Sequence, residues 1–306
     1  MTAPADQAGP LAAFDRHRRL LFAVAYQLLG SVADAEDVVQ DAWLRWSAAD
    51  RSGVTDDRAY LVQITSRLAL DRLRAARTRR ETYVGPWLPE PLLTEGNRPA
   101  AEGDPERAAE IGEQVSLALL VVLETLSPVE RAVFVLREVF GMSHAEVAGV
   151  LGRSEAAVRQ VAHRARQHVE ARRPRFDADR RAQQEVTERF LAACAGGDVD
   201  ALLAALSPGA VLISDGGGKA KAALRPIVGA EKVARFLIAT TATGVGDPAL
   251  SVRIADVNGS PGVVAWRNGE PFVAVSLVVA DGRIDQVLVV RNPDKLHGLG
   301  AAAAAG

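Results

Sequence analysis

SHAEVAGVLGRSEAAVRQVAHRAR, residues 143–166, carries the clearest structural pattern in the chain. Ser143 and Glu146 have the spacing of a capping box, which marks the start of a helix. Gly152 suits the turn that ends this helix, and Ser154 suits the cap of a longer second helix. Two helices joined by a glycine-bearing turn are typical of a helix-turn-helix, whose second helix lies in the major groove of DNA.

The second helix of this segment has an apolar and a polar face. Val158 and Val161 would pack against apolar residues of the first helix, such as Val147 and Val150. The opposite face combines side chains that suit bases and phosphates, so we predict DNA contact through Arg159, Gln160, His163, Arg164 and Arg166. A helical hairpin in an ordinary bundle can imitate this pattern, and the segment alone leaves that alternative open.

Two helices are also predicted nearer the N-terminus. In the first, Asp34, Asp37 and Asp41 form an acidic stripe and Trp43 lies on an apolar face. The stripe is either a solvated face or a docking surface for a basic partner. The second predicted helix has a cationic edge that suits phosphate contact, although solvated charge is again the alternative. Its candidates are Arg67, Arg74 and Arg77.

Residues 81–108 contain five prolines and three glycines, so neither a helix nor a central strand can persist there. This Pro-rich linker carries Trp87 and Leu88, and solvated linkers rarely expose so much apolar area. We therefore expect the linker to dock on another part of the chain.

After residue 180 the pattern changes to short helices followed by strands. Helices are predicted at 184–195 and 200–206, and β-branched runs predict strands at 263–266, 272–279 and 284–290. The pairs Asn258-Gly259, Asn268-Gly269 and Asp281-Gly282 favour tight hairpins. The segment is predicted to be an α+β domain with a largely antiparallel sheet.

Composition narrows the class of protein. The chain of 306 residues has one cysteine, Cys194, which excludes an intramolecular disulfide and favours a reducing, cytoplasmic compartment. No run reaches the ~18 apolar residues of a membrane span. His163 lacks the cysteines or carboxylates of a metal site, so no metal or cofactor is expected. A formal charge of −2 predicts weak binding to free DNA and the need for a partner.

The helical segments resemble a known family. DAEDVVQDAW at 34–43 is similar to the polymerase-binding helix of region two in sigma-70 factors of the compact extracytoplasmic-function (ECF) class. LVQITSRLALDRLR at 61–74 is similar to the adjoining element that melts and reads minus-ten DNA. Residues 126–166 resemble region four, which reads the minus-thirty-five element. Arg67 and Val161 depart from common family residues, which leaves the promoter sequence open.

The resemblance implies a multidomain, non-catalytic subunit that directs RNA polymerase to promoters. Region two would span 11–80, and region four, all-α like region two, would span 109–174. The acidic stripe and Trp43 would dock on the polymerase β′ clamp, with the β flap as a second contact. The cationic helix would read melted promoter DNA through Gln63, Arg67 and Arg74.

Residues 180–297 resemble a SnoaL-like domain, a cone of helices and curved antiparallel sheet. The motifs GDVD at 197–200, DGGGK at 215–219 and NPDKL at 292–296, with WLPEPL at 87–92, are similar to an ECF subgroup carrying this extension. The subgroup implies regulation in cis without a separate anti-sigma protein. The predicted interdomain residues are Trp87, Leu88, Asp215, Lys219, Asn292, Asp294 and Lys295.

Two functions from other classes remain open on the sequence. One is a ligand-responsive helix-turn-helix regulator that binds duplex DNA alone. The other is a sigma-like protein whose C-terminal domain keeps isomerase or cyclase activity, or binds a small apolar ligand. Catalysis would need a poised acid or base, for which Asp256, Glu270 and Asp285 are the candidates.

Overall fold

The computed structural model describes residues 9–94, 116–172, 179–242, 244 and 246–300. The second half of the predicted linker, the beginning of the predicted 109–174 segment and its last two residues lie outside the described residues. The chain divides into two compact units. The first comprises Met1–Thr78, Ala100–Glu113 and Leu123–Ala171, and the second comprises Arg79–Pro99, Gln114–Val122 and Arg172–Gly306.

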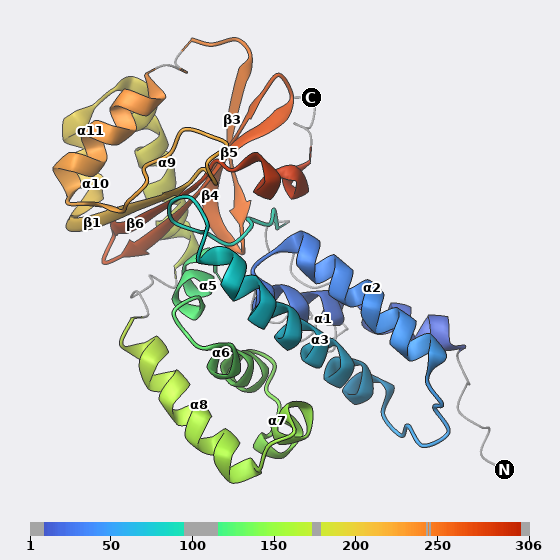
Figure 1. Ribbon diagram of the computed structural model, residues 1–306. Coiled ribbons are helices and arrows are strands. Elements are labelled where there is room, and N and C mark those ends of the chain that lie inside the picture. The colour runs from blue at the N-terminus through green and yellow to red at the C-terminus, as the bar shows by residue number, and fades with distance from the viewer. Residues whose placement is uncertain (1–8, 95–115, 173–178, 243, 245, 301–306) are drawn as a thin grey trace. The chain divides into compact units, whose positions relative to one another are not determined.

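The first unit is helical (Figure 1). Its elements are α1 (Pro10–Leu29), α2 (Val32–Ala48), α3 (Asp57–Arg80, whose last residues enter the second unit), α6 (Pro128–Phe134), the π-helical turn η1 (Val135–Val139), α7 (His144–Leu151) and α8 (Glu155–Glu170). No helix among the described residues has the length and apolar character to cross a membrane.

The helix starts follow from local capping. Ser31 caps α2, and Ser143 and Glu146 form the predicted capping box of α7. Gly152 ends α7 in the left-handed conformation with φ of 62°, and Ser154 caps α8. Such caps satisfy backbone groups that a helix leaves unpaired at its ends. The predicted helix-turn-helix is therefore confirmed as α7 and α8.

The second unit contains a six-stranded sheet in the order β2-β1-β6-β5-β4-β3 (Figure 1). Neighbouring strands are antiparallel except for β1 and β6, which run parallel. The strands are β1 (Leu206–Asp215), β2 (Ile227–Val228), β3 (Leu250–Val257), β4 (Ser260–Arg267), β5 (Glu270–Ala280) and β6 (Arg283–Val290). Leu206, predicted as the end of a helix, instead begins β1.

The three predicted hairpin turns are present. Asn258, Asn268 and Asp281 have φ between 51° and 54°, and each following glycine also has positive φ. Two consecutive positive φ values suit the right-handed twist of the adjoining strands. These turns join β3, β4, β5 and β6 into a meander, which confirms the predicted α+β class.

Each face of the sheet has its own apolar core. One face is covered by α9 (Arg180–Gly196), α10 (Val199–Ala205) and α11 (Ala230–Thr241) (Figure 1). The other face packs against the linker and α5 (Leu117–Leu123), through Leu88, Leu117 and Ala118. Leu296, which directly follows the short 3-10 helix η2 (Pro293–Lys295), and Leu299 of η3 (His297–Leu299) also belong to this second core. The linker and α5 thus help to complete the C-terminal domain.

Candidate functional site

The predicted acidic stripe lies on α2, and part of it is paired within the first unit. Arg72 of α3 donates a hydrogen bond to Asp34 with an Nε to Oδ1 distance of 2.8 Å, and it also forms an ion pair with Asp37. Burial alone would lower the pKa of the Arg72 guanidinium, but the two aspartates outweigh it and raise that pKa. Arg72 thus relieves the repulsion between Asp34 and Asp37. Asp41 is exposed.

Trp43 lies on a different face of α2 from the Arg72 pairing. Its half-buried ring meets Phe14 of α1 edge-on, with 5.2 Å between ring centroids. A groove of about 280 Å³ runs along this face, lined by Leu11, Phe14, Asp15, Arg18, Glu36, Val39, Gln40 and Trp43. The groove combines apolar and acidic groups, as a docking surface for a basic, partly apolar partner requires.

Two predicted DNA contacts on α3 are instead engaged with the helix-turn-helix. The Arg67 guanidinium donates to the carbonyl oxygens of Gly149 and Val150 at 2.7 and 2.8 Å. The Gln63 side chain donates to the Gly149 oxygen at 3.2 Å. These carbonyls lie at the C-terminal end of α7, where the helix dipole favours a cation. Arg74 and Arg77 are also exposed, and Arg74 pairs with Asp71 of its own helix at 2.8 Å.

A second polar contact, in the interior of the first unit, joins α6 to α1. Arg131 of α6 is only 1% exposed, and its guanidinium donates two hydrogen bonds to the backbone oxygen of Gln27, at 3.1 and 3.3 Å. The same side chain forms an ion pair with Glu124. Side-chain contacts therefore hold the first unit together at two places: Arg131 joins α6 to α1, and Gln63 and Arg67 join α3 to α7. We call this arrangement the closed form of the first unit.

The predicted recognition face of α8 is open. The five predicted DNA contacts, Arg159, Gln160, His163, Arg164 and Arg166, are all exposed, whereas Val158 and Val161 are buried. Arg159 pairs with Glu155 one turn earlier, and Arg166 pairs with Glu138 at 2.6 Å. Exposed pairs of this kind stabilise little, so they can exchange for phosphates.

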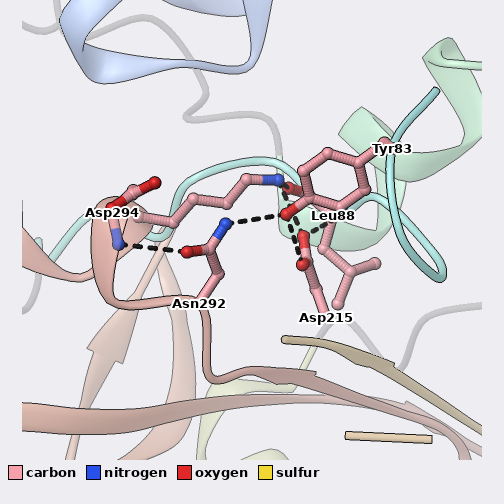
Figure 2. Close-up of polar contacts among 6 residues, drawn as sticks. Tyr83, Leu88, Asp215, Asn292 and Asp294 are labelled. Carbon is pink, nitrogen blue, oxygen red and sulfur yellow. Dashed lines mark hydrogen bonds and ion pairs between the residues drawn. The ribbon is translucent and has the colours of Figure 1, made fainter. Parts of the chain in front are cut away.

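In the second unit, Asp215 binds the linker backbone (Figure 2). Its carboxylate is fully buried and accepts hydrogen bonds from the Tyr83 hydroxyl at 2.6 Å and from the Leu88 N–H at 2.8 Å. Asn292 donates to the Tyr83 oxygen at 2.7 Å. We call Tyr83, Leu88, Asp215, Asn292 and Lys295 the linker clasp.

Lys295 completes the clasp from η2. Its ammonium group lies 2.7 Å from the Asp215 carboxylate and also donates to the Leu88 carbonyl oxygen, so both backbone groups of Leu88 are bound. Burial lowers the pKa of Lys295 to about 8, although Asp215 acts in the opposite direction. Two cations contact the Trp87 ring: its centroid lies 3.9 Å from the Lys295 nitrogen and 3.5 Å from the Arg80 guanidinium carbon.

The glycine-rich loop after Asp215 lies against the linker. A side chain at Gly217, whose φ is +57°, would place its Cβ 2.3 Å from the Asn292 amide nitrogen and 2.8 Å from the Tyr83 oxygen. At Gly218, whose φ is +72°, an added Cβ would lie 3.3 Å from the Val84 side chain, a less severe but still tight contact. At the end of the loop, exposed Lys219 pairs with Asp294. The DGGGK motif is therefore a glycine-rich turn that packs closely against the linker.

The linker has a second attachment at the edge of the sheet. Leu93 forms an antiparallel bridge with Val257 of the edge strand β3, and Asn258 N–H donates to the Leu92 oxygen at 2.8 Å. Beyond residues 95–115, the chain returns to the same domain at α5. The C-terminal domain thus holds the chain on both sides of that segment.

Comparisons with known proteins agree with these features. The family model described as Sigma-70 region 2 matches residues 13–79, and that described as Sigma-70, region 4 matches residues 116–169. The chain is 42% identical over 294 residues to the ECF RNA polymerase sigma factor SigJ of Mycobacterium tuberculosis, covering 93% of this chain and 92% of SigJ. The chain belongs to the ECF sigma factors.

Further relatives support this assignment. The sigma factor is 33% identical over 297 residues to the probable ECF RNA polymerase sigma factor SigI of M. tuberculosis, covering 96% of this chain and 97% of SigI. The crystal structure of M. tuberculosis SigJ matches it with a TM-score of 0.74 and 39% identity, covering 94% of this chain and 98% of that chain. As a sigma factor, the chain is a transcription initiation factor that works with core RNA polymerase on promoter DNA. The predicted family, fold class and main function are confirmed.

Sequence reasoning missed three residues that organise these sites of the sigma factor. Arg72 and Arg131 each look like an ordinary helix-surface arginine, because their partners lie far away in sequence. Tyr83 stands just before the WLPEPL motif, and its aromatic ring among prolines was the available signal. All seven predicted interdomain residues do lie together at the linker and the loops that hold it.

Proposed function

We propose that the C-terminal domain of this sigma factor controls initiation in cis by holding the linker between regions two and four. The observation that carries the proposal is the clasp, in which Asp215 and Lys295 bind both backbone groups of Leu88. Because the same domain packs against α5, it constrains both ends of the connection between the two promoter readers. Promoter elements have a fixed separation, so a domain that restrains the connection can regulate initiation.

Contacts within the first unit support an inhibitory sign for this control. Arg67 and Gln63 are proposed readers of minus-ten DNA, and they cannot bind DNA while they bind the end of α7. Region four must therefore separate from them when the promoter is engaged. A held linker opposes that separation, and a released linker favours it. We therefore assign the domain an inhibitory role that needs no separate anti-sigma protein.

Docking and DNA contact are assigned by exposure and charge. Asp34, Asp37, Asp41 and Trp43 form the proposed surface for the polymerase β′ clamp, and region four would also meet the β flap. The exposed Arg74 and Arg77 would contact melted DNA together with Gln63 and Arg67. The exposed face of α8 would read the minus-thirty-five element. The chain would act in the cytoplasm, where the polymerase works.

The C-terminal domain is proposed to have no turnover of its own. The fully buried carboxylate of Asp215 is saturated by Tyr83, Leu88 and Lys295, so it is unsuited to proton transfer. Asp256 forms an ion pair with Arg180, and Glu270 is exposed at a hairpin. The described residues include no group of three or more side chains that could hold a metal ion.

Trp87→Ala is the expected activating variant. The substitution removes the cation-π contacts of the Trp87 ring with Arg80 and Lys295. Each such contact is worth ~1 kcal/mol when it is partly buried. Release of the linker should raise promoter-dependent transcription by the reconstituted polymerase about fivefold. The control for nonspecific loss of packing is Phe22→Ala, which removes an aromatic ring of region two that stacks on Tyr26, away from the linker in sequence. Unchanged or lower output from Trp87→Ala would overturn the inhibitory role.

Arg159→Ala combined with Arg164→Ala tests the recognition helix. Both side chains are exposed on α8, so the fold should persist. Loss of two phosphate or base contacts should weaken holoenzyme binding to promoter DNA at least tenfold and reduce its dependence on salt. The measurement is fluorescence anisotropy over a salt series, with the exposed Arg189→Ala in α9 as control. Equal affinities would show that α8 does not contact DNA.

A further inference from the structure

Two arginines of the C-terminal domain lie against one aromatic ring. The guanidinium carbons of Arg267 and Arg291 lie 4.1 and 4.3 Å from the centroid of the Phe272 ring. Arg267 ends β4, Phe272 lies near the start of β5, and Arg291 directly follows β6, so adjacent strands bring the three together. Two like charges held this close repel each other. Burial, together with the charge of Arg267, lowers the pKa of Arg291.

Within the described part of the chain, the positive charges of Arg267 and Arg291 have only long, weak contacts with carboxylate and carbonyl oxygens. Arg267 has a long ion pair with Asp247, at 3.4 Å, and Arg291 donates a long hydrogen bond to the Lys221 carbonyl oxygen, also at 3.4 Å. The Nε atoms of both arginines are buried, and neither has a hydrogen-bond partner within the described part of the chain. Both arginine residues are nevertheless only partly buried, so the terminal N–H groups of their guanidinium groups can donate to an anion from outside.

Strand alternation at Arg267, and the ring that it shares with Arg291, place the arginine pair on the helix-covered face of the sheet. Trp266 belongs to the core on the linker side, so its neighbour Arg267 points to the opposite face. Arg291 directly follows β6, and its guanidinium group lies over the same Phe272 ring as that of Arg267. The pairing of β4 with β5 shifts here, so Phe272 lies between the paired residues Pro271 and Val273 and does not follow strict alternation. Val273 and Val275 of β5 are half-buried on this face. The charges therefore adjoin an apolar floor.

The neighbouring loop adds positive charge. Residues 216–226 contain Lys219, Lys221 and Arg225 and no carboxylate. Lys221 and Arg225 are exposed, and the backbone of Lys221 contacts Arg291. The surroundings of the arginine pair therefore favour an anion over a cation.

We propose that Arg267 and Arg291 bind the carboxylate of a small organic acid whose apolar part contacts Phe272 and Val273. A guanidinium group presents two N–H donors in a plane, which matches the two oxygens of a carboxylate. The partly exposed ring and valines supply the apolar contact that gives such a ligand an advantage over a bare anion. Neither the linker clasp nor the polymerase and DNA surfaces use these residues.

Isothermal titration calorimetry of the full chain with octanoate, 1-octanol and inorganic phosphate tests the site. Octanoate should bind saturably, and its uncharged counterpart 1-octanol and phosphate should each bind at least tenfold more weakly. The Arg267→Gln, Arg291→Gln double variant should weaken octanoate binding at least tenfold. Arg253→Gln is the matched control, because Arg253 stacks on Trp266, 4.4 Å from its ring centroid, on the other face of the sheet.

Several outcomes would overturn the proposal. Absence of saturable octanoate binding at about 5 mM excludes the site in this form. Equal binding of octanoate and 1-octanol shows an apolar surface only, and equal binding of phosphate shows no role for the apolar floor. If circular dichroism shows that the double variant is unfolded, the single variants Arg267→Gln and Arg291→Gln test the site instead. Each should weaken octanoate binding at least threefold. Unchanged affinity in both single variants contradicts the assignment.

Discussion

In the Asp215→Asn variant, the Leu88 amide proton should exchange with solvent about 100-fold faster than in the unsubstituted sigma factor. The change leaves Lys295 buried without its counter-charge and weakens the acceptor for Leu88 N–H. Removing one partner of a buried ion pair destabilises by ~3 kcal/mol or more, which corresponds to that factor. Hydrogen exchange followed by mass spectrometry on a peptide containing Leu88 measures it.

Lys295→Met should have a similar effect, because it leaves the Asp215 carboxylate buried and unpaired. The double variant should be less destabilised than the sum of the two single variants, since neither charge is then left alone. Lys219→Met is the matched control: it breaks an ion pair in the same loop whose side chains are 56% and 55% exposed. That control should change exchange little. Additive effects of the two clasp variants would show that Asp215 and Lys295 do not act as a pair.

Features with local causes could be predicted from the sequence. The capping boxes, Gly152 and the three Asn-Gly or Asp-Gly turns act within four residues, so the helix-turn-helix and the β3 to β6 meander follow from short segments. The parallel pairing of β1 with β6 was not predicted. It joins residues such as Leu212 and Val287, which are far apart in the chain and have no local signal.

The candidate sites likewise combine features that the sequence predicts with features that only the structure shows. The linker motif and the loops at Asp215 and Asn292 were linked by their resemblance to one subgroup, and the structure gives their chemistry as recognition of the Leu88 backbone. Arg67 was predicted to face DNA. Its bonds to the end of α7 depend on how α3 meets the helix-turn-helix, which periodicity within one helix cannot show. The closed form of the first unit therefore became visible only in the structure.

Reversing the charges of Asp37 and Asp41 should abolish assembly with the polymerase. Asp41 is exposed, and Asp37 is more than half exposed despite its pairing with Arg72, so both are available to a basic partner. Two lysines there would replace attraction by repulsion, which costs several kcal/mol in an interface. About 3 kcal/mol corresponds to roughly 100-fold weaker binding.

The control for this reversal must also break an exposed ion pair on region two. Asp71→Lys does so, because Asp71 pairs with Arg74 at 2.8 Å on the exposed side of α3. Loss of this ion pair should change the free energy of unfolding by well under 1 kcal/mol. Loss of the pair between Asp37 and Arg72 should have an equally small effect. Any difference between the variants then reports on the docking surface and not on folding.

The affinity of the purified sigma factor for core RNA polymerase is the most direct test of the account. Biolayer interferometry with the unsubstituted chain, the Asp37→Lys, Asp41→Lys variant and Asp71→Lys would measure it. We expect tight binding of the first and third proteins and at least 100-fold weaker binding of the double variant. Equal affinity of all three, or no binding by the unsubstituted chain, would contradict the proposed role of α2 as the polymerase-docking helix.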